Sequence, residues 1–267
     1  MKLFSHLTFA LSLPCFFNGL LSVSEIKYPF LSLTNALRNA KFMMIKLLSI
    51  RRVNMKKLFI FDLDGTILDT INDLYSAVNY SLEKNGLPAR TKDEVTAFTG
   101  NGIRRLIDLS VPNGTPDTVT DIVFYDFKTY YAEHCNDSTR PYDGIKEVLS
   151  ELKKNGCLLA VVSNKIDSAV QNLVNLHFPD VFDSVTGQKD GIRKKPYPDS
   201  VNFVLSSLNV PRSEAVYIGD SEVDIATAKN AGLPCVTVCW GFRSEPYLKS
   251  VGATTIIHAP KELLNIK

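Results

Sequence analysis

The feature that most constrains the fold is an alternation, from Met55 onward, of short apolar runs rich in β-branched residues with stretches of helical periodicity. Such runs are typical of strands buried on both faces of a parallel sheet, whose connections are crossover helices. The sequence therefore predicts an α/β fold, a doubly wound parallel sheet with a Rossmann-like core. Strands are expected at 58–62, 158–163, 184–186, 215–219, 235–238 and 255–258. The clearest core helices are expected at 145–155, 167–176, 199–208 and 222–231.

A long segment separates the first strand from the helix expected at 145. It has about 80 residues, too many for one crossover, and its periodicity predicts helices at 71–85, 92–98, 103–109 and 116–135. We predict a small helical cap domain, residues 71–140, inserted into a core made of 55–70 and 141–267. Ligands of open α/β sheets bind outside the carboxyl ends of the strands, so this cap is expected to cover the site as a lid.

Residues 1–54 differ from the rest of the chain. They hold seven basic residues and one acid, and all four methionines fall within the first 55 residues. We expect residues 1–54 to lie outside the fold, as an N-terminal extension produced by a start site assigned too early. The alternative is a signal segment, because the apolar stretch 7–23 ends in a small-x-small pattern that resembles a signal-peptidase site, and residues 1–24 would then direct export.

The composition of the body limits the function classes. The 213 residues after position 54 carry a net charge of −4, which predicts no nucleic-acid partner. Five cysteines form no CxxC pair and no Cys/His cluster at zinc spacing, and His134, His177 and His258 are expected to be ordinary surface or core residues. We predict a cytoplasmic protein, a monomer or small homo-oligomer, whose folded body has no membrane partner.

Polar side chains follow the expected strands at four places. The run FDLDGT at 61–66 puts Asp62 and Asp64 two residues apart, which sends both to the same side of the strand. A loop of turn-forming residues is the alternative interpretation of this run. Ser163 and Asn164 end the second strand, where a helix N-cap is equally compatible with the pattern.

Two further segments complete the set. Lys195 lies in the run KKPYP at 194–198, where prolines favour extended backbone, although solvated loop lysines would look the same. Asp220 and Asp224 flank the turn between the strand at 215–219 and the following helix, where Asp220 or Ser221 as a helix N-cap is again the alternative. The convergence of so many acids on the strand ends of one sheet favours function over capping.

This constellation predicts a metal-assisted site. The carboxylates of Asp62, Asp64, Asp220 and Asp224 would repel one another in one crevice unless a cation were bound there. Oxygen ligands favour Mg²⁺. Ser163 and Lys195 would add donors for a bound anion, so the residue chemistry indicates phosphoryl transfer from a small-molecule phosphate ester.

The same residues carry a resemblance to a known family. DxDGT at 62–66, Ser163, Lys195 and GDxxxD at 219–224 match, in order and spacing, the four motifs of the haloacid dehalogenase-like superfamily of phosphohydrolases, over about residues 57–257. The helical insert resembles the small C1-type cap. The run FTGNGIRRL at 98–106 resembles the cap loop of phosphoglycolate phosphatases.

The resemblance implies roles for the motif residues. Asp62 is expected to attack phosphorus and form an aspartyl-phosphate, and Asp64 to act as general acid and then general base. Mg²⁺ is expected to be bound by the Asp62 carboxylate, the Asp64 backbone carbonyl and Asp220, with Asp224 orienting its waters. Ser163, Asn164 and Lys195 would hold the phosphoryl group. Further expected substrate-binding residues are Thr66, Gly100, Asn101 and Arg104.

The function predicted is a Mg²⁺-dependent phosphoric monoester hydrolase with 2-phosphoglycolate as the favoured substrate. A phosphatase for nucleotides, sugar phosphates or pyrophosphate, or a β-phosphoglucomutase-like isomerase, remains open, as does a silent binding module. Asp64 argues against the dehalogenase branch, which lacks the second Asp. Thr66 argues against the mutases, which tend to carry Val there.

Overall fold

The computed structural model describes Arg38 and residues 56–267, so the expectations for residues 1–54 lie outside the described part. The strands are β1 (Leu58–Phe61), β2 (Leu68–Asp69), β3 (Arg140–Pro141), β4 (Leu158–Ile166), β5 (Ser184–Gln188), β6 (Ala215–Gly219), β7 (Cys235–Val238) and β8 (Ile256–Ile257). The helices are α2 (Ile71–Lys84), α3 (Lys92–Phe98), α4 (Ile103–Ser110), α5 (Asp117–His134), α6 (Ile145–Lys154), α7 (Asp167–His177), α8 (Asp199–Ser207), α9 (Glu222–Ala231) and α10 (Glu245–Ser250), with short 3₁₀ segments η2 (Arg212–Glu214) and η3 (Pro260–Asn265).

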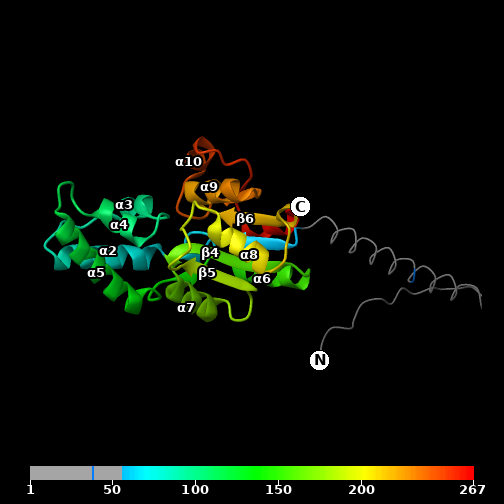
Figure 1. Cartoon of the computed structure of the whole chain (residues 1–267), viewed down its shortest axis with the longest axis horizontal. Helices are drawn as coiled ribbons and strands as arrows, with labels where there is room; N and C mark the ends of the chain where they lie inside the picture. The colour runs from blue at the N-terminus through cyan, green and yellow to red at the C-terminus, as the bar shows by residue number, and fades with distance from the viewer. Residues whose placement is uncertain (1–37, 39–55) are drawn as a thin grey trace, which may run out of the picture. The chain divides into compact units, whose positions relative to one another are not determined.

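The main sheet has six parallel strands in the order β5-β4-β1-β6-β7-β8 (Figure 1). The chain starts in the middle at β1, moves outward through β4 to β5, and then crosses to β6 on the other side. This reversal makes the carboxyl ends of β1, β4 and β6 a switch point, where open α/β sheets bind ligands. The predicted doubly wound parallel sheet is confirmed.

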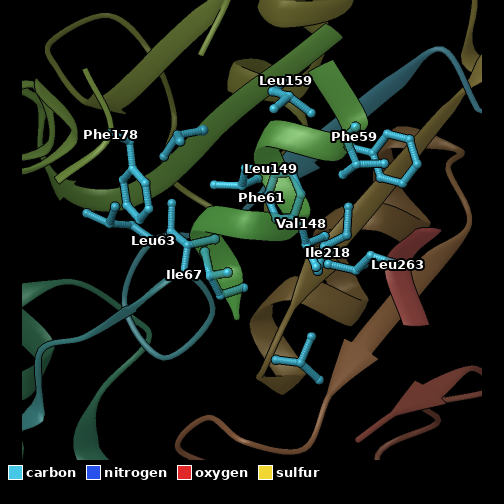
Figure 2. Close-up of a cluster of buried hydrophobic side chains, with 14 of the residues drawn as sticks. Phe59, Phe61, Leu63, Ile67, Val148, Leu149, Leu159, Phe178, Ile218 and Leu263 are labelled. Carbon is cyan, nitrogen blue, oxygen red and sulfur yellow. The ribbon is translucent and has the colours of Figure 1, made fainter. Parts of the chain in front are cut away.

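Alternate residues of β1 anchor two apolar layers, because successive strand side chains point to opposite faces. Phe59 and Phe61 belong to a buried cluster completed by apolar residues of α6, α7 and η3. Figure 2 shows both rings in this cluster with Val148, Leu149 and Leu263. Leu58 and Ile60 belong to a second cluster completed by α8 and α9. Because both faces of β1 are buried, the strand is a continuous run of apolar residues.

Helices α2–α5 form a helical insert between β2 and β3 (Figure 1). These four helices supply a third buried cluster that includes Leu82, Ile107 and Phe127. The chain leaves and re-enters the core through β2 and β3, which pair antiparallel, with Leu68 opposite Pro141. The insert therefore has its own apolar interior and a two-stranded attachment.

Two local expectations are corrected. The strand expected to end at Ser163 continues to Ile166, and its pairing with β5 shifts register between Val162 and Ile166. Helix α7 begins at Asp167, so neither Ser163 nor Asn164 is its N-cap. Within the described residues, no helix is both long and apolar enough to cross a membrane.

Candidate active site

A pocket opens where the carboxyl ends of β1, β4 and β6 face the helical insert. Seven of the predicted site residues line it: Asp62, Asp64, Gly100, Ser163, Asn164, Lys195 and Asp220. Further lining residues are Leu74, Thr99, Gly102, Ile103, Leu106, Lys165, Ser221, Phe242 and Arg243. The seven predicted residues come from five distant segments of the sequence and meet at the switch point of the sheet.

Asp62 lies at the end of β1 and is buried. Its Oδ1 accepts a hydrogen bond from the Leu63 backbone N–H at 2.7 Å and lies 2.8 Å from Lys195 Nζ. Burial, followed by the nearby Asp224 charge, raises the pKa of Asp62 well above its ordinary value, and Lys195 opposes this shift only in part. Asp62 is thus held in one orientation by two donors on the same oxygen.

Lys195 joins Asp62 to Asp224. Its Nζ donates to Asp224 Oδ1 at 2.8 Å and to the Tyr217 hydroxyl at 3.2 Å. Burial alone would lower the pKa of Lys195, but Asp224 and Asp62 raise it well above its ordinary value. Lys195 therefore remains a cation inside the protein.

The amide of Asn164 fixes the position of the Lys195 backbone. Its Oδ1 accepts from the Lys195 N–H at 2.7 Å, and its Nδ2 donates to the Lys195 carbonyl at 3.1 Å. Nδ2 also donates to the Gly100 carbonyl of the insert at 3.1 Å. Asn164 thus links strand β4, the lysine loop and the insert.

Asp224 anchors the start of α9. Its Oδ2 accepts from both the backbone N–H and the hydroxyl of Ser221, at 3.1 and 2.6 Å. Its Oδ1 accepts from Lys195 and from the Tyr217 hydroxyl at 3.1 Å. The capping interpretation is therefore correct for Ser221, the N-cap of α9, and not for Asp220, while Asp224 at the third helical position also belongs to the site.

Asp220 lies beneath the turn formed by Gly65 and Thr66. Its Oδ1 accepts from the Thr66 hydroxyl at 3.3 Å, and its Oδ2 accepts from the Phe242 backbone N–H at 2.7 Å. Gly65 has φ +81°, and a Cβ there would collide with the Asp220 carboxylate. Glycine is therefore required by both the backbone conformation and the close approach.

Three carboxylates form a cluster suited to a cation. Oxygens of Asp62, Asp220 and Asp224 lie within 4.8 Å of one another, and all three residues are buried. Burial and the Asp224 charge raise the pKa of Asp220 to about 7. A buried set of hard oxygen donors fits Mg²⁺, whose charge would favour the ionised forms of Asp62 and Asp220.

The carboxylate of Asp64 points to a different partner. Its Oδ1 accepts from Lys165 Nζ at 2.8 Å, and the same ammonium lies 2.6 Å from the hydroxyl of Tyr131 in helix α5. Sequence reasoning missed Lys165 and Tyr131. Lys165 lies two residues after Ser163, and alternation along a strand could have placed both side chains on one side.

The predicted cap residues are not all brought to the pocket. The Arg104 guanidinium pairs with Asp108 at 2.8 Å and with Asp121, and among the described residues Arg104 and Asn101 are outside the pocket lining. The Asn101 carbonyl accepts from Lys194 Nζ at 2.9 Å. Helical spacing alone could not show that acids on α4 and α5 would engage Arg104.

Within the described part of the chain, Arg243 is the arginine that lines the pocket, and sequence reasoning missed it. Its Nε pairs with Glu222 Oε2 at 3.0 Å. Its other nitrogens donate to the carbonyls of Thr96 and Thr99 at 2.8 and 2.9 Å, at the carboxyl end of α3. Arg243 therefore connects the core to the insert.

The sequence and fold match known proteins. A model of the haloacid dehalogenase-like hydrolase family matches residues 59–238. The phosphoglycolate phosphatase of Caulobacter vibrioides is 34% identical over 203 residues, which cover 74% of this chain and 85% of that protein. The phosphoglycolate phosphatase of Pseudomonas savastanoi pv. phaseolicola is 33% identical over 194 residues, with coverage of 70% and 71%.

A solved structure agrees with these relatives. A protein of Lactobacillus delbrueckii subsp. bulgaricus, described provisionally as a phosphoglycolate phosphatase, superposes with a TM-score of 0.75 at 41% identity, covering 79% of this chain and 98% of that one. The chain belongs to the haloacid dehalogenase-like hydrolases. The resemblance inferred from its four motifs is confirmed.

Proposed function

We propose that this chain is a Mg²⁺-dependent phosphatase that hydrolyses a small phosphomonoester, with 2-phosphoglycolate as the favoured substrate, through an aspartyl-phosphate on Asp62. The observation that carries the proposal is the buried cluster of Asp62, Asp220 and Asp224 beside the ammonium of Lys195. The family membership and the names of the relatives support the same reaction class.

In the first step, the Asp62 oxygen not engaged by Lys195 attacks phosphorus, and the bond from phosphorus to the leaving alkoxide breaks. Asp64 donates a proton to that alkoxide. Leu63 N–H and Lys195 hold the nucleophile in position. Ser163 and Lys195 stabilise the negative charge on the transferring phosphoryl group.

In the second step, Asp64 takes a proton from water, the water oxygen attacks phosphorus, and the bond to Asp62 breaks to release inorganic phosphate. Lys165 fixes the orientation of Asp64, and Tyr131 of the insert fixes Lys165. The acid–base residue is thereby linked to the helical insert, which we propose acts as a cap over the pocket.

Asp62 and Asp220 are the proposed carboxylate ligands of Mg²⁺, with the Asp64 backbone carbonyl as a third. Both oxygens of Asp224 already accept hydrogen bonds, which supports its proposed role in orienting metal-bound water. When bound, Mg²⁺ supplies positive charge to the phosphate oxygens and to Asp62.

The preference for a carboxylated substrate has support from helix α4. Its first residues, Gly102 and Ile103, line the pocket, and glycine at the N-cap leaves the first-turn N–H groups uncapped by a side chain. Backbone N–H groups and the positive end of the helix dipole favour an anion there. We place substrate carboxylate recognition at this helix start rather than at Arg104.

The four free cysteines of the described part, Cys135, Cys157, Cys235 and Cys239, are compatible with a reducing compartment. They support the proposal that the enzyme acts in the cytoplasm. We also propose that it is a monomer or small homo-oligomer.

The test is phosphate release by the full chain with and without Mg²⁺ from 2-phosphoglycolate, nucleoside monophosphates, hexose phosphates and pyrophosphate. We expect release only with Mg²⁺ and the highest kcat/KM for 2-phosphoglycolate. Mg²⁺-dependent release led by another compound would overturn the substrate and keep the reaction. Isomerisation of a sugar phosphate without phosphate release, or no turnover at all, would overturn the phosphatase.

A further inference from the structure

A second group of metal-ligating side chains lies at the far edge of the sheet. Cys239 follows β7, His258 follows β8, and Glu245 begins α10. The Cys239 sulfur, a Glu245 carboxylate oxygen and a His258 ring nitrogen all lie within 4.8 Å of one another. None of the three lines the phosphatase pocket, whose described lining is given above.

Neighbouring contacts already hold these residues in place. The Cys239 N–H donates to the Ile257 carbonyl at 3.0 Å, which fixes the ends of β7 and β8 side by side. His258 Nε2 lies 2.9 Å from Glu245 Oε2, while Lys249 holds the other Glu245 oxygen at 2.7 Å. The backbone of His258 donates to Glu262 at 2.9 Å. The set is therefore arranged by backbone pairing and by supporting hydrogen bonds.

The types of ligand atom indicate which metal ion the group can bind. A thiolate, an imidazole and a carboxylate suit Zn²⁺, which takes three protein ligands and a water in open tetrahedral sites, whereas Mg²⁺ prefers oxygen alone. Zinc–ligand bonds of about 2.0–2.3 Å place tetrahedral ligand atoms roughly 3.2–3.8 Å apart. The three atoms lie within 4.8 Å of one another, so binding of an ion requires them to adjust to that spacing. The His258 and Glu245 side chains are 61% and 33% exposed, so an ion can reach them from solvent.

We propose that Cys239, Glu245 and His258 form a Zn²⁺ site, distinct from the carboxylate cluster of the phosphatase. Lys249, which contacts the second oxygen of Glu245, then orients this carboxylate toward the ion.

Zn²⁺ bound at the proposed site would affect the loop that follows β7. Cys239 and Glu245 bound the loop 240–244, whose Phe242 N–H donates to Asp220 and whose Arg243 holds the insert. An ion that joins both ends of this loop restricts its motion, as a metal clip does. Zn²⁺ bound here therefore stabilises the segment that supports Asp220.

The test titrates the full chain, in excess Mg²⁺, with Zn²⁺ by calorimetry and with Co²⁺ as a spectroscopic probe. We expect a Co²⁺–thiolate charge-transfer band that Zn²⁺ displaces. Co²⁺ bound only at Asp62, Asp220 and Asp224 gives no such band, because that cluster has no thiolate. The band thus identifies the site independently of phosphatase activity.

Variants locate the ligands. Cys239→Ser should abolish the band, and His258→Gln should weaken Zn²⁺ binding by more than about 100-fold, since loss of an outer partner alone typically costs 10–100-fold. Cys235→Ser and His134→Gln are matched controls; His134 is also exposed and bonded to a carboxylate, that of Asp137. Circular dichroism without metal checks the fold of each variant. Absence of the band in the wild type, or equal Zn²⁺ affinity in His258→Gln and His134→Gln, would overturn the proposal.

Discussion

Lys195 is the residue on which the charge balance of the pocket depends. The buried carboxylates of Asp62, Asp220 and Asp224 face one buried ammonium, which contacts Asp62 and Asp224. If all four groups are ionised, two negative charges are left over. Buried charge must be compensated, and a divalent cation supplies the amount required. Without one, the raised pKa values of Asp62 and Asp220 favour the protonated forms of these two carboxyl groups.

This balance predicts a pH dependence of Mg²⁺ binding. The pKa of Asp220 is about 7 in the folded, metal-free protein against an ordinary value of 3.8. The folded state thus holds a proton that the unfolded state releases, so the stabilising contribution of this group is lost as pH rises from about 4 through 7. Mg²⁺ competes with that proton, and its binding should strengthen over the same range.

The measurement is the increase in Tm caused by Mg²⁺ at pH 5.5 and at pH 8. We expect the larger increase at pH 8, because a ligand that binds the folded state stabilises it more when its affinity is higher. Asp220→Asn should remove most of the increase at both values. An equal increase at both pH values in the wild type would show that the carboxylate cluster does not bind the ion.

Replacement of Lys195 by Met should destabilise the protein. The change keeps most of the apolar part of the side chain but leaves Asp62 and Asp224 without their ammonium, and breaking a buried ion pair costs about 3–5 kcal/mol. Urea unfolding at pH 8 without metal measures the free energy of unfolding. Lys194→Met, at the exposed neighbouring position, is the control and should cost less than about 0.5 kcal/mol. Similar values for the two variants would contradict the assigned pairing.

At the scale of elements, the contact between Arg243 and the end of α3 joins the core to the insert. The last carbonyls of a helix carry partial negative charge and need donors, and a guanidinium can serve several at once. Arg243 contacts Thr96, Ala97 and Thr99 of the insert and Glu222 of α9. A single side chain therefore holds the insert against the core beside the pocket.

Arg243→Lys should lower kcat/KM for 2-phosphoglycolate by about tenfold, since the single lysine nitrogen cannot reproduce the fork of contacts. Tenfold corresponds to about 1.4 kcal/mol, the scale of one or two hydrogen bonds. Arg104→Lys is the matched control on α4, where the guanidinium is exposed and paired with Asp108 and Asp121. We expect less than a twofold change there. Arg104→Lys having the larger effect would restore the original prediction that Arg104 reads the substrate.

Elements could be predicted from the sequence where local pattern decides structure. The apolar run of β1 and the sequence of α3, which begins after Thr91 in a capping box with Glu94, were sufficient to place those elements. The end of β4 was not predictable in this way. Its last residues, through Ile166, are extended because they pair irregularly with β5, a contact that depends on the three-dimensional fold.

At the scale of the whole molecule, the strand ends that meet at the switch point could be predicted, because parallel topology brings every carboxyl end to one edge. Asp62 and Asp220 directly follow β1 and β6, as that rule predicts, and Ser163 of β4 and Lys195 of the loop after β5 line the same pocket. Sequence reasoning missed the contact residues that come from the insert or from another loop. Tyr131 reaches Lys165 from the insert, and Phe242 reaches Asp220 from the loop after β7.

That the helical insert moves as a cap over the core is a prediction. The insert has its own apolar cluster and a two-stranded attachment, and it contacts the core around the pocket through Tyr131, Gly100 and the bonds of Arg243. Besides these polar contacts, Phe242 of the core packs against the apolar cluster of the insert. Such an arrangement is suited to a lid that opens for substrate and closes over the reaction.

The central claim is that Asp62 is the nucleophile of a Mg²⁺-dependent phosphatase, and the most direct test compares the full wild-type chain with Asp62→Asn. The substitution removes the attacking carboxylate with little change of volume. We predict Mg²⁺-dependent phosphate release from 2-phosphoglycolate by the wild type, and loss of at least about 10³-fold in kcat for Asp62→Asn, with unchanged circular dichroism. Phosphate release by Asp62→Asn near the wild-type rate would contradict the account.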